Sequence, residues 1–166
     1  MEIQDAHVYP VPVDAVVAML RDQAATIEKY ESMGHRDVQI LECEADDDAL
    51  TIKSSRVVDV DLPGFAKKVL KPTNTMVQTD EWRRARDGSW AGTFDVEVKG
   101  APVRIAGTMR LAPADAGCRH EVTIDFQVKV PIVGGKIADW AAKNDGRRTL
   151  SAEFAFNDER LRAHDA

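Results

Sequence analysis

His120 is the residue in this sequence best placed for acid–base chemistry. Residues 118–130 alternate between an apolar set and a polar set, and His120 belongs to the apolar set with Val122 and Phe126. An inward-facing histidine can act as acid or base, because its unperturbed pKa is about 6.5. A structural histidine, hydrogen-bonded near the start of its strand, explains the same pattern and is favoured. His120 is thus the one catalytic candidate, and no catalytic residue is assigned.

Three polar residues close to the end of the chain share one face of a predicted helix. At about 100° per residue, Asn144, Arg148 and Ser151 point the same way as the apolar residues of that helix. Such groups can hold the polar part of a ligand in a mainly apolar pocket. Arg147 is an alternative to Arg148. A rotation or kink at Gly146 would instead turn these groups toward solvent or strand-end carbonyls, and both interpretations stay open.

Short patterns that resemble metal or nucleotide motifs lack essential partners. His120-Glu121 is followed by Ile124 where a zinc-binding helix needs its second histidine. Gly135-Lys136 lacks the upstream glycine and the following Ser or Thr of a phosphate loop. The acidic run 46–48 lacks the spacing of a calcium loop. We therefore predict no metal and no cofactor.

Composition limits the class of protein. With 166 residues, 44% of them hydrophobic, residues 1–166 are expected to form a single domain with a sizeable core. A net charge of −6 disfavours nucleic acid as a partner. No apolar run approaches the roughly 18 residues of a membrane span, so stable membrane insertion is not expected. Residues 1–5 do not resemble a signal peptide, and two distant cysteines suggest reduced thiols, so we predict a cytoplasmic location. The oligomeric state stays open.

The first half of the chain is predicted to contain strands and two short helices. Expected strands cover 2–9, 35–44 and 49–60, and expected helices run from Asp14 through Leu20 and from Asp22 to a stop at Gly34. Residues 65–70 form an expected short amphipathic helix with three nearby lysines. Its Phe65 is a ligand-binding candidate if this segment covers a cavity, and a solvated helix is the alternative. A less favoured alternative is that the lysines contact an acidic partner or a membrane surface.

The second half alternates more regularly. Strands are expected at 73–86, 90–99, 103–111 and 118–130, followed by one long helix from about residue 136 to 161. Hairpins make such a sheet antiparallel, and only the long helix can cover its apolar face. The large apolar residues expected to face inward are both core and ligand-binding candidates, namely Trp82, Phe94, Met109, Phe126 and Trp140.

This order of elements resembles the helix-grip fold of the START-like, or SRPBCC, superfamily. The features that carry the resemblance are Asp22, Leu62-Pro63, Trp82, Gly100-Ala101-Pro102 with Gly107, and Pro131 to Lys136. More narrowly, the chain is similar to an uncharacterised bacterial domain-of-unknown-function family within that superfamily. The resemblance implies an α+β fold in which a curved antiparallel sheet of about six to seven strands wraps around a long C-terminal helix. Two short helices follow the first strand.

The resemblance also implies a deep apolar cavity between sheet and helix. We therefore expect non-enzymatic binding or carrying of an apolar small molecule, such as a lipid or a polyketide-like compound. An aromatase/cyclase-type enzyme with an acid–base residue in the cavity is one alternative. A protein-interaction module without a ligand is the other.

Overall fold

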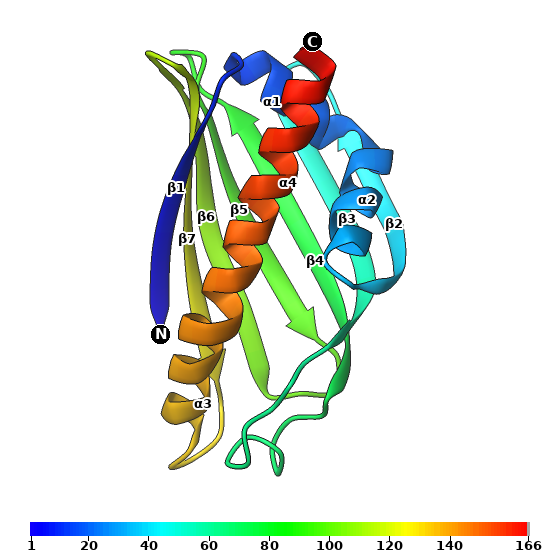
Figure 1. Ribbon diagram of the computed structural model, residues 1–166, viewed down its shortest axis with the longest axis vertical. Helices are drawn as coiled ribbons and strands as arrows, with labels where there is room; N and C mark the ends of the chain where they lie inside the picture. The colour runs from blue at the N-terminus through cyan, green and yellow to red at the C-terminus, as the bar shows by residue number, and fades with distance from the viewer. Residues whose placement is uncertain (166) are drawn as a thin grey trace.

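The strands of this protein form one antiparallel sheet. The computed structural model describes residues 1–165, and Ala166, the last residue of the predicted domain, lies outside the described residues. The strands are β1 (Glu2–Tyr9), β2 (Arg36–Ala45), β3 (Ala49–Asp59), β4 (Thr73–Arg84), β5 (Trp90–Val98), β6 (Val103–Ala114) and β7 (Gly117–Val128). They form a seven-stranded sheet in the order β1-β7-β6-β5-β4-β3-β2 (Figure 1). The N-terminal strand thus pairs with the last strand, and β2 lies at the opposite edge.

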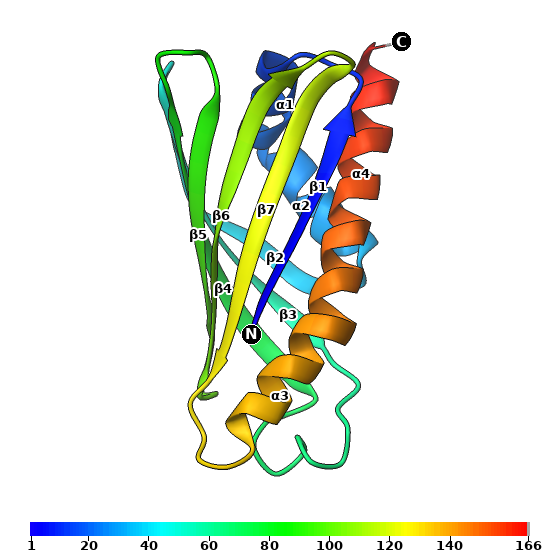
Figure 2. The ribbon, with the colours of Figure 1, turned by 90° about the vertical axis from the view of Figure 1, so that its left-hand side faces the viewer.

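The helices lie on one side of this sheet. They are α1 (Val13–Arg21), α2 (Gln23–Ser32), α3 (Gly134–Trp140) and α4 (Arg147–Asp165), with a π-helical segment, η1 (Ala141–Gly146), between the last two. Together α3, η1 and α4 make one continuous helix that runs along the sheet, while α1 and α2 lie beside α4 (Figures 1 and 2). This is the helix-grip α+β fold, so the predicted fold class is confirmed.

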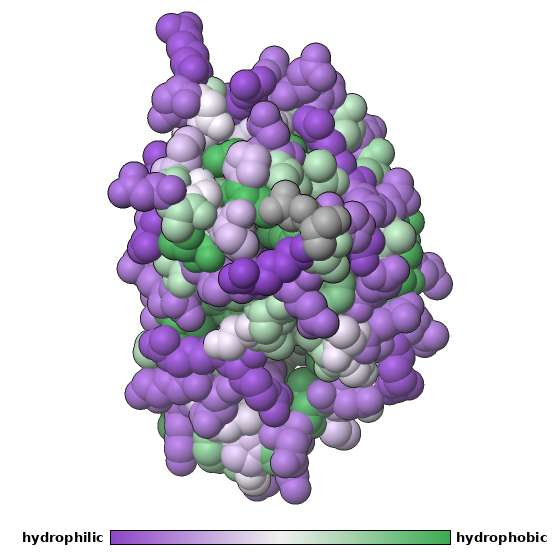
Figure 3. All heavy atoms as spheres, turned by 45° about the horizontal axis from the view of Figure 1, so that its top comes forward, coloured by the Kyte–Doolittle hydropathy of each residue, from purple (hydrophilic) through white to green (hydrophobic). Residues whose placement is uncertain are grey.

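Local signals explain most of the boundaries. The side chain of Asp22 accepts a hydrogen bond from the backbone N–H of Ala24 at 3.0 Å, which caps α2. Gly34 follows this helix with φ of 85°, a conformation that glycine adopts without strain. In β5, buried and exposed residues alternate without exception, as predicted for a half-buried strand. On the face drawn in Figure 3, hydrophilic side chains predominate and hydrophobic ones form smaller patches among them.

The segment predicted to form a short amphipathic turn of helix at 65–70 makes a single turn and no regular helix. Residues 64–69 form hydrogen-bonded turns, and the bond from Leu70 N to Ala66 O, at 2.9 Å, is not continued into a helix. Pro63 and Pro72 bracket this segment, so there is no room to extend the first turn. Phe65 is half-buried and carries the Lys136 ammonium 4.2 Å from its ring centroid.

Candidate functional site

A cavity of about 140 Å³ lies between the concave face of the sheet and the C-terminal helix. Apolar side chains from five strands form its floor and walls. The larger of them are Met76, Trp82, Phe94, Val96, Ile105, Met109, Val122, Ile124 and Phe126. Four of the predicted ligand-binding residues, Trp82, Phe94, Met109 and Phe126, are therefore brought together around one space.

A second, smaller cavity of about 60 Å³ lies toward α3. Trp140 lines this second cavity and not the larger one, and Phe65 lines neither. The two cavities share Met76, Ile105 and Phe126 in their walls. The side chains of these shared residues therefore separate the two spaces.

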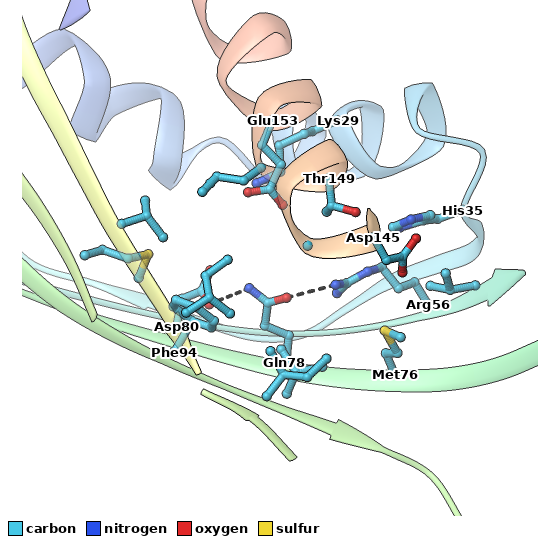
Figure 4. Close-up of a pocket in the computed structure, with 18 of the residues that line it drawn as sticks. Lys29, His35, Arg56, Met76, Gln78, Asp80, Phe94, Asp145, Thr149 and Glu153 are labelled. Atoms are coloured by element: carbon cyan, nitrogen blue, oxygen red, sulfur yellow. Dashed lines mark hydrogen bonds between the residues drawn. The ribbon is translucent and has the colours of Figure 1, made fainter. Parts of the chain in front are cut away.

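The roof of the larger cavity is the junction between η1 and α4. A Cβ atom on Gly146 would lie 2.6 Å from the Phe126 ring, so only glycine lets this ring pack directly against the helix backbone. A π-helical turn holds one more residue than an α-helical turn and changes the direction in which the following side chains point. Asp145, Thr149 and Glu153 consequently face the cavity (Figure 4).

Of the two interpretations of Asn144, Arg148 and Ser151, the orientation toward the cavity is wrong and the orientation toward solvent is correct. All three are exposed. The Asn144 amide donates to the Trp140 carbonyl at 3.0 Å, and Arg148 pairs with Asp145 at 2.7 Å on the outer side of the helix. Ile137, Phe154 and Leu161 are buried toward the ends of this helix, and in its middle the buried residues are Ala142, Gly146 and Leu150. A polar centre does face the cavity, but it is built from the neighbouring residues.

The most polar wall of the cavity is a hydrogen-bonded chain on β3 and β4. The Arg56 guanidinium donates from Nη2 to Gln78 Oε1 at 2.9 Å, and Gln78 Nε2 donates to Asp80 Oδ1 at 2.8 Å (Figure 4). Arg56 is only 5% exposed, and its Nε and Nη1 atoms have no hydrogen-bond partner among the described residues. Burial raises the pKa of the Asp80 carboxyl, against the lowering effect of the bond from Gln78.

Tyr30 on α2 lies next to this chain and gathers three basic side chains. The Arg56 guanidinium carbon is 3.9 Å from its ring centroid and the Lys29 ammonium 4.7 Å, while His35 stacks on the ring at 5.7 Å. Burial lowers the pKa of His35 to about 4, with Arg56 and Lys29 acting in the same direction. Burial disfavours the charge of Lys29, but neighbouring acidic groups, led by Tyr30, outweigh it and raise the Lys29 pKa. At neutral pH the positive charge of this wall therefore comes from Arg56 and Lys29.

His120 lies at the other end of the cavity. Asn157 Nδ2 donates to the Tyr9 hydroxyl oxygen at 3.2 Å, and that hydroxyl lies 3.0 Å from His120 Nδ1. When the Tyr9 hydroxyl donates to Nδ1, the imidazole proton lies on Nε2, an atom without a partner among the described residues; the other tautomer reverses the roles of Nδ1 and the hydroxyl. Burial lowers the pKa of His120 to about 3, so the ring is neutral at pH 7. The favoured structural interpretation, a buried and hydrogen-bonded histidine, matches this geometry.

One side of the cavity approaches the surface between α2 and the C-terminal helix. An outer groove in this place shares four lining residues with the cavity, namely His35, Val58, Asp145 and Thr149. Arg148 lies in the outer groove. A molecule that reaches the cavity by this path would pass the basic groups around Tyr30 first.

Comparison with known families places the chain. A family model described as a protein of unknown function, DUF2505, matches residues 5–161. The chain belongs to this family. The predicted membership of an uncharacterised family is thereby confirmed. No curated protein matches the sequence.

Solved structures show the wider relationship of this DUF2505 chain. The protein TTHA0849 from Thermus thermophilus superimposes with a TM-score of 0.69 at 16% identity, and the match covers 100% of both chains. A STAR-related lipid transfer protein from Xanthomonas axonopodis gives a TM-score of 0.63 at 16% identity, over 97% of this chain and 85% of that one. Ara h 8.0201 gives 0.55 at 11% identity, over 98% of each chain. The predicted START-like fold is confirmed, and at these identities the likeness shows the fold alone.

Two kinds of feature are not found in the part of this DUF2505 chain that the structure describes. No group of three or more His, Cys, Asp or Glu side chains there is arranged to hold a metal ion. Among residues 1–165, no helix is both long enough and apolar enough to span a bilayer.

Sequence reasoning missed the polar wall, although its signal is visible. Arg56 occupies an inward position of β3, in register with the buried Leu50, Ile52 and Val58. A charged residue at such a position is unusual, because burial of an unpaired charge is costly. Gln78 and Asp80 hold the equivalent positions of β4 beside Trp82. No comparable signal in the sequence indicated that Lys29 belongs to this wall, because its position depends on how α2 docks on the sheet.

Proposed function

We propose that this protein binds a compact apolar small molecule, lipid-like or polyketide-like, in the cavity between the sheet and the C-terminal helix. The observation that carries the proposal is a mainly apolar space of about 140 Å³, with polar groups on the β3–β4 wall, at the helix roof and at the His120 end. Ligand sites are typically apolar with a few placed polar groups that set orientation. The candidates Trp82, Phe94, Met109 and Phe126 form the apolar contact surface in this proposal.

The volume favours a ring compound over an extended chain. An apolar cavity of about 150 Å³ is known to accept benzene in another protein. A longer lipid requires the larger and smaller cavities to merge, and the shared residues Met76 and Phe126 are the side chains that would move. The fold of a lipid transfer protein among the structural neighbours is compatible with either ligand.

We propose a non-catalytic role for His120. Its pKa of about 3 makes the neutral ring a weak base at pH 7. In the tautomer with its proton on Nε2, this unpartnered nitrogen can instead donate a hydrogen bond to a ligand oxygen. Binding rather than turnover is therefore the function that this end of the cavity supports best.

The proposal is tested by native mass spectrometry of the purified protein, with extraction of any bound compound. A co-purifying apolar molecule is expected. Ethylbenzene serves as a defined probe in calorimetric titrations. It should bind the wild-type protein, and Val96→Phe should weaken binding by at least about tenfold, because the new ring occupies the cavity.

The control substitution is Thr93→Phe, which adds the same ring to the exposed face of the same strand. It should leave probe binding unchanged. A protein that carries no small molecule and does not bind the probe, or that binds it equally well with Val96→Phe, contradicts the proposal.

A further inference from the structure

In the described part of the chain, the guanidinium of Arg56 has no acid partner within its own wall. Its hydrogen-bonded neighbour is the neutral amide of Gln78, which separates it from Asp80. Two of its nitrogens, Nε and Nη1, are buried without an acceptor among the described residues. An unsatisfied buried charge costs far more than an unsatisfied neutral group, so such an arrangement favours a bound acceptor that carries negative charge.

We propose that the ligand of this cavity is a monocarboxylic acid, whose carboxylate accepts hydrogen bonds from Arg56 and whose apolar body lies among Trp82, Phe94 and Val122. This inference rests on the proposed binding function and adds the chemical class of the ligand. The carboxylate lies at the end of the cavity nearest the outer groove. The apolar body then points toward His120.

The other charged groups that face this place set the charge of the ligand. Lys29 adds a second cation on the Tyr30 side. Asp80, Glu153 and Asp145 also line the cavity, and Asp145 is paired with Arg148 on its outer side. A ligand with a single negative charge would balance the Arg56 guanidinium, which has no acid partner among the described residues. A dianionic phosphate would meet the nearby carboxylates, so the geometry favours a monoanion.

The geometry also explains why Gln78, and not a glutamate, stands beside Arg56. A carboxylate at this position would neutralise the guanidinium at a distance of about 2.9 Å. The guanidinium would then not need a negatively charged acceptor from a ligand. The amide holds the guanidinium in place through one hydrogen bond and leaves its charge uncompensated. Gln78 is a positioning residue in this arrangement.

The test compares 4-ethylbenzoate with 4-ethylbenzamide, two probes of nearly equal shape that differ in charge. Affinities are measured at pH 7.5 by calorimetry and by two-dimensional NMR titration. The wild-type protein should bind the acid about tenfold more tightly than the amide. In Arg56→Met, affinity for the acid should fall about 10- to 100-fold, and affinity for the amide should change by no more than about threefold.

A second variant keeps the volume of the wall and the charge of Arg56. Gln78→Glu should remove the preference for the acid as well, because the new carboxylate occupies the guanidinium. If Arg56→Met does not fold, Gln78→Glu alone tests the proposal. Arg104→Met is the control, since Arg104 is exposed and pairs with Asp95 at 2.7 Å on the outer face. It should keep the preference.

The outcomes separate this inference from the proposed function. Equal binding of acid and amide by the wild-type protein, or a preference that survives both Arg56→Met and Gln78→Glu, overturns the carboxylate site and leaves cavity binding intact. Failure of the acid, the amide and ethylbenzene to bind overturns both. A preference that disappears in both variants and persists in Arg104→Met supports the assignment.

Discussion

At the scale of single residues, two buried polar side chains of the cavity lining, His120 and Arg56, have defined neighbours. His120 contacts Tyr9 through a hydrogen bond and packs against Trp82 and Phe154, with ring centroids 6.1 and 5.3 Å away. Arg56 contacts Tyr30 and Gln78 but retains N–H groups without an acceptor among the described residues. These two residues lie at opposite ends of the cavity, so a ligand with two polar groups could satisfy both.

The buried state of His120 predicts a specific loss of stability in acid. Its folded pKa of about 3 lies below the unfolded value of 6.5, because burial disfavours the charged ring. The unfolded state therefore takes up the proton first as the pH falls, and the stability present above pH 6.5 is lost toward pH 3. Between pH 7 and pH 5, the wild-type protein should lose about 2 kcal/mol relative to His120→Gln.

This difference is measured by urea unfolding of both proteins at several pH values. His164→Gln is the control, because His164 is exposed on the last turn of α4. It should follow the wild-type curve. Parallel curves for the wild-type protein and His120→Gln would show that folding does not lower the pKa of His120.

At the scale of elements, the π-helical turn η1 decides what the C-terminal helix presents to the cavity. Gly146 allows the Phe126 ring to lie against the helix backbone, and the wide turn brings Asp145, Thr149 and Glu153 inward. π-Helical turns occur frequently at functional sites. Here the turn forms the roof of the proposed ligand site, so its integrity should matter for both stability and binding.

Two glycine substitutions separate packing from helix propensity. In Gly146→Ala, the new methyl group would lie 2.6 Å from Phe126 and 3.1 Å from Ile3. The clash should exceed the gain in helix propensity and lower the free energy of unfolding by about 1–2 kcal/mol. In Gly135→Ala the new methyl group meets no atom within 4 Å among the described residues.

Gly135→Ala should therefore be neutral or stabilise the protein by up to about 1 kcal/mol. Both variants are compared by urea denaturation, with ethylbenzene titration as a second readout. If Gly146→Ala proves as stable as Gly135→Ala, the close approach of Phe126 to the helix does not constrain this position.

At the scale of the whole molecule, segments near the two ends of the chain pack against other elements, while the start of β1 and the end of α4 lie far apart (Figures 1 and 2). β1 pairs with β7 along its full length, and α4 returns to α2 near the start of the chain (Figure 1). Arg160 on α4 is 19% exposed. It pairs with Asp22, the N-cap residue of α2, and with Glu28 further along the same helix. This link joins the two helices that border the path into the cavity.

Removal of this link should loosen the contact between α2 and α4. Arg160→Met is expected to lower the free energy of unfolding by about 1 kcal/mol, since two partly exposed ion pairs are lost. Arg162→Met should change it by less than about 0.5 kcal/mol, because Arg162 pairs with Asp158 within its own helix. Thermal and urea unfolding at low and high salt provide the measurement. A difference between the variants that does not shrink in about 1 M salt would argue against an ionic link.

The sequence by itself determined the sheet, its turns and the presence of a long closing helix. Alternation in β5 and β7 is a local property of the pleated backbone, and caps such as Asp22 act within a few residues. Only the tertiary structure decided which face of the closing helix meets the cavity. The π-helical turn η1, in which Gly146 lets the Phe126 ring approach the backbone, changes which residues in the middle of the helix face inward, and local periodicity does not register this change. The polar wall likewise needed the folded molecule, because Lys29, Arg56 and Glu153 come from three elements that meet only when α2 and α4 dock on the sheet.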